Sequence, residues 1–202
     1  LYTNYRHLKQ TLTLESGMDT VLAVISDHGH SLGIDPGDKG WISKQGHPMT
    51  HAVADLVMMI RHPEGVGAGS RCGVLCYNHD LTATLMAMIG VEPKQEMDGV
   101  DLWPMVLSNA EGRDHVTVAW GPLITVITDE WWYNANIWGE GELLYRVAED
   151  PDLQNSLAKE RTDICRDLLS LAVQDAGGSI PDDFAAYHDR PGCTLYGDRP
   201  TS

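Results

Sequence analysis

The chain has 202 residues, and 14 Lys and Arg against 29 Asp and Glu give it a formal net charge of −15. Such an acidic chain lacks the clustered positive charge with which proteins bind phosphate backbones, so nucleic acid is not an expected partner. Hydrophobic residues make up 43% of the sequence, enough for a folded core. No apolar run approaches the roughly 20 residues of a membrane-spanning helix, so no membrane partner is expected either.

The first predicted elements lead to a polar cluster. Residues 2–14 carry apolar side chains at helical spacing, and Gly17 is placed to end that helix. Residues 21–25 are apolar throughout, which predicts a parallel strand buried on both faces. The strand runs into Ser-Asp-His-Gly-His at 26–30. Because α/β enzymes place their chemistry at the carboxyl ends of such strands, this cluster is the first candidate site.

The middle of the chain predicts a long loop, a strand and a helix. Residues 31–51 are rich in Gly and Pro, which predicts a loop without regular elements, and long ordered loops tend to be functional. Residues 55–60 are a second strand candidate, and 79–89 have the apolar spacing of a helix that Gly90 ends. The Gly-rich stretch 65–73 lacks the Gly-Lys-Ser/Thr ending of a phosphate-binding loop.

From residue 113 the pattern changes to short strand-like runs at 116–118, 124–127, 131–137 and 143–147. The Gly-Glu-Gly at 139–141 is a hairpin signal, so these runs predict a small antiparallel sheet. A helix is expected over 162–173, and residues 179–202 read as an irregular tail. The predicted division is therefore 1–112, an α/β part; 113–178, the sheet with its packed helix; and 179–202, the tail.

Asp27 and His28 are the strongest candidates for chemistry. A carboxylate and an imidazole side by side at a strand end can supply half of the ligands of a divalent cation. Gly29 lets the backbone turn tightly beside them. The alternative is that Asp27 caps the following turn and His28 is a surface residue.

Other polar residues near this cluster are weaker candidates. Lys44 lies in the loop that follows and could bind an anionic ester oxygen, although most lysines are simply solvated. His47 and His51 have the spacing of a helical zinc pair, but Pro48 argues against a helix there. His47 could instead donate a hydrogen bond to a substrate oxygen, and His30 could support the site or be merely exposed.

The cysteines and tryptophans favour structural roles. The four cysteines have no zinc-finger spacing and read as reduced thiols; they are Cys72, Cys76, Cys165 and Cys193. Most of the six tryptophans lie in the predicted antiparallel sheet. Packing in the core of that sheet is the favoured interpretation, and stacking on a sugar or aryl group is the alternative.

Several segments, in the same order, resemble the C-terminal half of a sulfatase. They are Ser26-Asp27-His28-Gly29 with Leu32-Gly33, Lys39-Gly40-Trp41-Ile42-Ser43-Lys44, residues 55–64, residues 78–85, residues 90–93 with 97–102, and residues 142–145 with 149–155. Sulfatases belong to the alkaline-phosphatase-like superfamily, which also contains phosphonate monoester hydrolases and phosphodiesterases. Two departures are Val57 and Ala83, each at a position where the family usually has proline.

The resemblance implies a fold and a set of site residues. It implies the C-terminal part of an alkaline-phosphatase-like mixed-sheet α/β sandwich, followed by a small antiparallel sheet with a packed helix. Asp27 and His28 match ligands of one divalent metal ion, expected to be Ca²⁺, with Mn²⁺ or Zn²⁺ as alternatives. Lys44 matches the lysine that holds the anionic oxygens of the ester. Apart from the resemblance, His47 is expected as a further substrate contact and His30 in support, because both lie close to the cluster in the sequence.

The expected activity is metal-dependent hydrolysis of a small anionic sulfate ester. The family's nucleophile motif, Cys or Ser followed by x-Pro-x-Arg, is absent from the 202 residues, so the chain is expected to be a fragment without turnover in isolation. The alternatives are a phosphonate or phosphodiester hydrolase of the same superfamily and a truncated, non-catalytic binding module. The expected location is cytoplasmic, and the oligomeric state, a homo-oligomer included, stays open.

Overall fold

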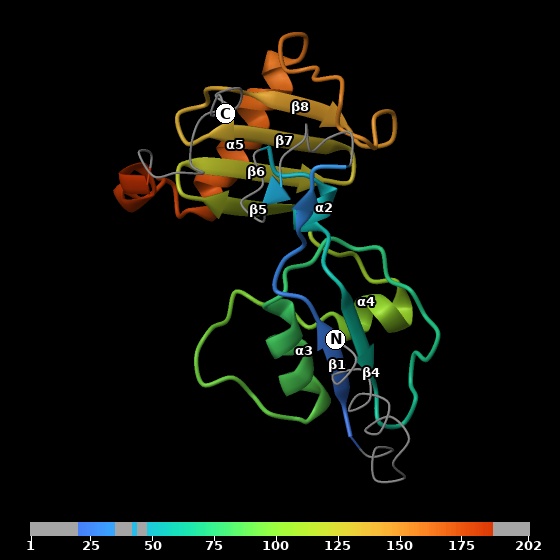
Figure 1. Cartoon of the computed structure of the whole chain (residues 1–202). Helices are drawn as coiled ribbons and strands as arrows, with labels where there is room; N and C mark the ends of the chain where they lie inside the picture. The colour runs from blue at the N-terminus through green and yellow to red at the C-terminus, as the bar shows by residue number, and fades with distance from the viewer. Residues whose placement is uncertain (1–19, 35–41, 44–47, 188–202) are drawn as a thin grey trace. The chain divides into compact units, whose positions relative to one another are not determined.

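The computed structural model describes residues 20–34, 42–43 and 48–187 (Figure 1). The chain divides into two compact units, the first comprising residues 1–27 and 56–112 and the second residues 28–55 and 113–202. Segment 28–55 therefore belongs with the C-terminal part of the chain, although in the sequence it stands between the two segments of the first unit. Within the described ranges, no helix is long and apolar enough to cross a membrane.

The first unit is built around a two-stranded antiparallel sheet. Strand β1 (Leu22–Ile25) pairs with β4 (Met58–Arg61), and Ser26 donates its backbone N–H to the Val57 carbonyl at 3.0 Å just beyond the paired residues. The prediction of a parallel strand buried on both faces was wrong for this part of the chain, because β4 runs antiparallel and β1 is only half-buried. An apolar run indicates that a strand is buried on both faces. Whether the strand pairs in a parallel or an antiparallel direction depends on the distant segment that pairs with it.

Two helices accompany this sheet. Helix α3 (Asp80–Met88) confirms the helix predicted over 79–89, whereas the short α4 (Trp103–Ser108) was not predicted. Helix α4 has a proline at its start and ends at Asn109, whose φ of 51° is left-handed. The helix has only six residues, too few for a periodic pattern.

A buried pair of polar side chains on α3 binds the segment that follows the helix. The Asp80 carboxylate accepts the backbone N–H of Tyr77 at 2.7 Å and that of Val100 at 2.8 Å. The Thr84 hydroxyl donates to the Asp80 carbonyl at 2.8 Å and accepts the Leu102 N–H at 2.9 Å. Both side chains are 0% exposed. We call this arrangement the Asp80–Thr84 clasp, and it fixes both the start of α3 and the chain from 100 to 102.

The second unit contains the antiparallel sheet that the sequence predicted. Strands β5 (His115–Trp120), β6 (Leu123–Thr128), β7 (Trp131–Asn136) and β8 (Leu143–Arg146) pair in chain order, and α5 (Thr162–Asp175) packs against them (Figure 1). The predicted hairpin at 139–141 joins β7 to β8. A 3₁₀ helix (Asp182–Tyr187) lies within the segment that the sequence suggested to be irregular.

The two faces of this sheet are covered by different segments. Alternate residues such as Val126 and Tyr133 belong to the core cluster that includes α5. The intervening Trp132 lies on the opposite face, where its indole N–H donates to the Met49 carbonyl at 3.0 Å and its ring lies 4.3 Å from the ring of His51. Segment 48–55, with helix α2 (His51–Ala54), therefore packs on the face away from α5.

The expectation that residues 31–51 contain no regular element was wrong. Strand β2 (Ser31–Leu32) pairs antiparallel with β3 (Ile42–Ser43), and α2 begins at the last residue of that range. Elements this short leave no periodic signal among the glycines and prolines. Their formation depends on packing within the second unit, because Thr50 and Val53 are buried there.

Tyr145 and Cys165 are buried titratable groups of the second unit. Burial, reinforced by the charge of Asp150, raises the pKa of Tyr145 to about 12, and its hydroxyl has no hydrogen-bond partner among the described residues. Burial, reinforced by Glu142, raises the pKa of the Cys165 thiol to about 11. A thiol with so high a pKa stays protonated at neutral pH, which agrees with a structural role for Cys165.

Candidate functional site

Asp27 lies where the sequence predicted it, two residues beyond the end of β1. It is exposed and contributes to an open pocket of about 600 Å³ within the first unit. The residues that line this pocket come from the end of β1 and the start of α3: Ile25, Ser26, Asp27, Asn78, His79, Leu81 and Thr82. The strand-end carboxylate thus lies at a shallow, widely open pocket.

His28 is the first residue of the second unit, and its ring orientation is constrained by its neighbour. Its Nδ1 lies 2.6 Å from the Gly29 carbonyl oxygen. A carbonyl oxygen only accepts, so this contact favours the neutral tautomer that carries the proton on Nδ1 and the lone pair on Nε2. This is the tautomer in which a histidine can coordinate a metal through Nε2.

The glycine in the polar cluster, Gly29, is required by a close approach of two backbone segments. Its backbone N–H donates to the Val53 carbonyl at 2.9 Å, which brings the two backbones together within the second unit. A Cβ at position 29 would overlap the Ala52 carbonyl oxygen and lie 2.9 Å from the carbonyl carbon. Only glycine fits this approach, and the contact holds the chain just after His28.

Asn78 and His79 are pocket residues that the sequence reasoning did not identify as functional. The His79 ring stacks on Tyr77 with centroids 4.7 Å apart and planes 16° apart, and its side chain is 47% exposed. Immediately after it, the Asp80–Thr84 clasp fixes the chain. An Asn-His pair directly before a helix was visible in the sequence, but nothing local indicated that it faces the end of β1.

The remaining predicted site residues are not brought into this pocket by the described structure. His30 is exposed and does not line it. Lys44 and His47 lie outside the described residues. Across 20–34, 42–43 and 48–187, no group of three or more His, Cys, Asp or Glu side chains forms a metal-binding cluster. Asp27 and His28 therefore remain a prediction of two metal ligands.

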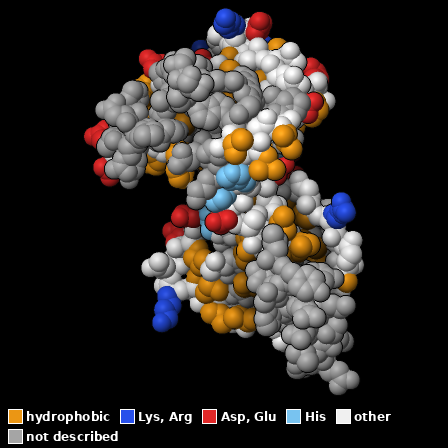
Figure 2. Space-filling model, viewed as in Figure 1, with side chains coloured by type: hydrophobic (Ala, Val, Ile, Leu, Met, Phe, Trp, Pro, Cys, Tyr) orange, Lys and Arg blue, Asp and Glu red, His pale blue; other side chains and the backbone are white. Residues whose placement is uncertain are grey.

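The charge of the pocket is distinctive. Among the described residues, Asp27 is the one charged residue that lines it, and no described Lys or Arg contributes to it. Lys and Arg side chains are also scattered on the face of the molecule drawn in Figure 2. The described part of the lining can therefore receive a cation or neutral hydroxyl groups, and none of its side chains is a Lys or Arg.

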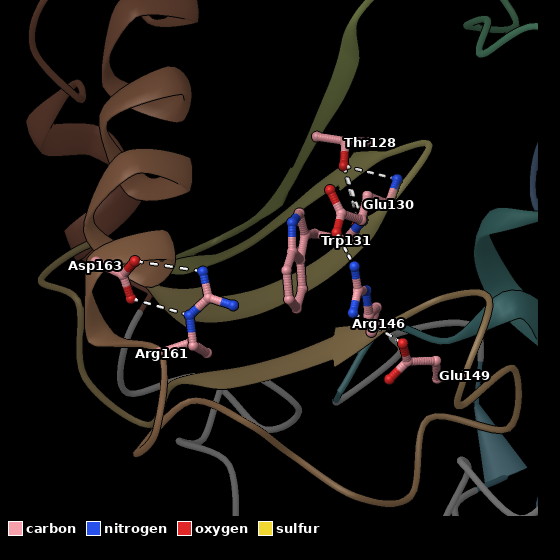
Figure 3. Close-up of polar contacts among 7 residues, drawn as sticks. All are labelled: Thr128, Glu130, Trp131, Arg146, Glu149, Arg161 and Asp163. Carbon is pink, nitrogen blue, oxygen red and sulfur yellow. Dashed lines mark hydrogen bonds and ion pairs between the residues drawn. The ribbon is translucent and has the colours of Figure 1, made fainter.

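Two arginines flank Trp131 on the second unit. Trp131 lies between the guanidinium groups of Arg146 and Arg161, whose Cζ atoms are 5.6 and 5.5 Å from the ring centroid (Figure 3). Each guanidinium already pairs with carboxylates, which are Glu130, Glu149 and Asp163. Their charges are locally neutralised, so this arrangement stabilises the edge of the sheet rather than forming an anion site.

Comparison with known proteins relates the chain to sulfatases. No family model matches it. An N-acetylglucosamine-6-O-sulfatase of Bacteroides thetaiotaomicron is 32% identical over 95 residues, which are 47% of this chain and 16% of that protein. A structure solved in complex with its substrate, D-glucosamine-2-N,6-O-disulfate, superposes with a TM-score of 0.69 and 18% identity, over 93% of this chain and 39% of that one.

A third match is an enzyme that hydrolyses phosphonate monoesters. The phosphonate monoester hydrolase of Agrobacterium radiobacter superposes with a TM-score of 0.63 and 22% identity, over 91% of this chain and 38% of that one. The chain thus spans about 40% of the length of these structures. At these identities the structural matches establish the fold, and the shared region is the C-terminal part of the larger proteins.

Proposed function

Because the chain is a homologue of sulfatases and has the alkaline-phosphatase-like fold of their C-terminal region, we propose that it is part of a metal-dependent sulfate ester hydrolase. The relatives that the chain resembles are sulfuric ester hydrolases. For this chain we propose a dependence on a metal ion, a small anionic ester as substrate, and roles for individual residues.

The donor set at the end of β1 fits a divalent cation. Asp27 supplies a carboxylate oxygen at the rim of the pocket, and the Nδ1 contact of His28 leaves the lone pair of the neutral ring on Nε2. One oxygen and one nitrogen donor suit Ca²⁺, Mn²⁺ or Zn²⁺, each of which needs at least two further ligands. When bound, the cation would polarise the ester and favour the ionised nucleophile.

The other residues have roles that follow from charge. Lys44 would bind the anionic oxygens of the transferred group and offset the charge that develops on them. His47 would donate a hydrogen bond to the same group, and His30 would support the site from the turn after His28. Since the overall charge of −15 repels an anionic substrate, binding must rest on the local positive charge of the metal and Lys44.

The observation that carries this proposal is the constrained His28 ring next to Asp27. The two alternatives, a phosphonate or phosphodiester hydrolase and a non-catalytic binding module, would have the same fold, so only their need for metal ligands distinguishes them. A phosphonate or phosphodiester hydrolase, favoured by the match to the phosphonate monoester hydrolase, would use the same two ligands. A non-catalytic binding module would need neither of them.

A thermal unfolding experiment tests the metal site. Addition of Ca²⁺, and separately Mn²⁺ or Zn²⁺, should raise the melting temperature of the chain, because an ion bound only to the folded state stabilises it. Asp27→Asn should abolish this rise, while the control Asp152→Asn, at an exposed carboxylate, should retain it. No rise with any of the three ions, or a rise that Asp27→Asn leaves unchanged, would contradict the metal site.

Turnover assays test the second part of the proposal. Two metal ligands without a nucleophile motif should give no hydrolysis of an aryl sulfate or of an aryl phosphodiester by the chain alone, with or without metal. Measurable hydrolysis of the sulfate would show that the chain contains a complete site. Hydrolysis of the phosphodiester alone would favour the phosphodiesterase alternative.

A further inference from the structure

We propose that Asp27 and His28 form a hinge between the two units, and that a cation bound by both residues fixes one unit relative to the other. This inference rests on the metal site of the proposed function. It gives the bound ion a conformational task in addition to its task in ester hydrolysis.

The boundary between the units falls between the two proposed metal ligands. Asp27 is the last residue of the first segment of the first unit, and His28 is the first residue of the second unit. The chain also passes between the units after residues 55 and 112. Each of these crossings lies outside the helices and strands. A hinge consists of a few such residues, whose backbone angles absorb the movement of the bodies on either side.

On the side of the first unit, the chain is fixed up to Ser26. The Ser26 backbone N–H donates to the Val57 carbonyl at 3.0 Å, and the Ser26 hydroxyl accepts the Val57 N–H at 3.0 Å. Both bonds lie within the first unit, next to the paired residues of β1 and β4. Asp27 therefore follows directly on a residue that is held in place, and its carboxylate moves with the first unit.

On the side of the second unit, the chain is fixed from Gly29 onward. The Gly29 N–H donates to the Val53 carbonyl at 2.9 Å, and a Cβ at this position would overlap the Ala52 carbonyl oxygen. His28 Nδ1 lies 2.6 Å from the Gly29 carbonyl oxygen, which ties the imidazole to the same body. At this crossing, the freedom of the chain is thus confined to the backbone angles of Asp27 and His28.

An ion bound by both side chains would remove this freedom. Consecutive residues are close enough to share one ion, so the proposal needs no other contact between the units. Because the carboxylate belongs to one unit and the imidazole to the other, an ion that holds both excludes the backbone angles that separate the two donors. The ion then favours one arrangement of the units, and its preference for that arrangement sets the extent of the shift.

The test compares how strongly each unit aligns in a dilute liquid-crystalline medium, measured as residual dipolar couplings of backbone amides in the isotopically labelled full chain. Units that move independently align to different degrees, whereas the parts of one rigid body share one alignment. Without a divalent ion, the first unit, read on β1, β4 and α3, should differ from the second, read on β6, β7 and α5. Saturation with Ca²⁺ or Zn²⁺ should make the two degrees of alignment equal. Asp27→Asn should keep them different, while the exposed control Asp152→Asn should behave as the unchanged chain.

Equal alignment of the two units before any ion is added would overturn the inference, because no movement would then be left to restrict. Alignments that stay different at an ion concentration that raises the melting temperature, or that become equal in Asp27→Asn, would overturn it as well. Failure of the hinge is distinguishable from failure of the metal site. If no ion raises the melting temperature, the metal site is absent; if one does and the alignments still differ, only the hinge is refuted.

Discussion

Asp80→Ala is the most informative single change to the scaffold of the pocket. The carboxylate accepts two backbone N–H groups, from Tyr77 at 2.7 Å and Val100 at 2.8 Å, in a side chain that is 0% exposed. A hydrogen bond to a charged group is worth about 1.5–3 kcal/mol, and both donors lose their acceptor. The change should therefore lower the free energy of unfolding of the first unit by about 3–6 kcal/mol.

The assay combines urea denaturation with amide hydrogen exchange at Tyr77 and Val100. A loss of about 3 kcal/mol corresponds to roughly 100-fold faster exchange where exchange reports the opening equilibrium. Asp80→Asn keeps one acceptor oxygen and should lose about half as much, whereas the exposed Glu92→Ala should stay within about 0.5 kcal/mol. A loss below about 1 kcal/mol for Asp80→Ala, with unchanged exchange at both amides, would refute the clasp.

Three further changes test other parts of the structure. Thr84→Val should lower the free energy of unfolding by about 1–2 kcal/mol in urea denaturation, because it removes the acceptor of a buried N–H; no loss would contradict that hydrogen bond. Gly29→Ala should destabilise the second unit by several kcal/mol in the same assay, since a Cβ there overlaps backbone; a neutral change would show that α2 does not pack against it. Tyr145→Phe should raise the free energy of unfolding by about 1 kcal/mol, because it removes a hydroxyl without a described partner. Burial raises the pKa of Tyr145 from 10.0 to about 12 and that of Cys165 from 9.0 to about 11, so the unfolded chain ionises first and the free energy of unfolding should fall as pH rises from about 9 to 12. Tyr145→Phe should reduce this alkaline loss in pH-dependent denaturation, and an equal loss in the variant would contradict the burial of the phenol.

The antiparallel sheet and α5 could be predicted because their signals are local. Strands β5 to β8 are neighbours in sequence, and each hairpin pairs residues a short distance apart, so alternation and turn residues suffice. Helix α5 repeats apolar residues over 14 positions. In such segments the sequence pattern and the final contacts agree.

The arrangement of β1 and the following segment could not be predicted in the same way. The partner of β1 is β4, more than 30 positions along the chain, and nothing within 22–25 specifies the antiparallel pairing. Likewise, segment 48–55 is anchored through the Trp132 contact with Met49, which joins residues 83 positions apart. These outcomes are decided by tertiary contacts that a local pattern does not contain.

The candidate site also contains residues that a local pattern indicates and residues that only tertiary contacts bring to it. Asp27 could be singled out from the sequence because it follows an apolar strand, and in the structure it lines an open pocket. The pocket itself requires the end of β1 and the start of α3 to meet, so the sequence did not indicate that Asn78 and His79 line it. The tautomer of His28 depends on the backbone geometry at Gly29, which no residue pattern encodes.

The most direct test of the central claim, that Asp27 and His28 hold a catalytic metal ion, is ¹⁵N NMR of the His28 imidazole during titration with Ca²⁺ and Zn²⁺. The proposed site predicts that Nδ1 stays protonated while the Nε2 signal shifts on metal addition, and that Asp27→Asn removes this shift. An Nε2 signal unaffected by either ion, or one that moves equally in Asp27→Asn, would contradict the metal site.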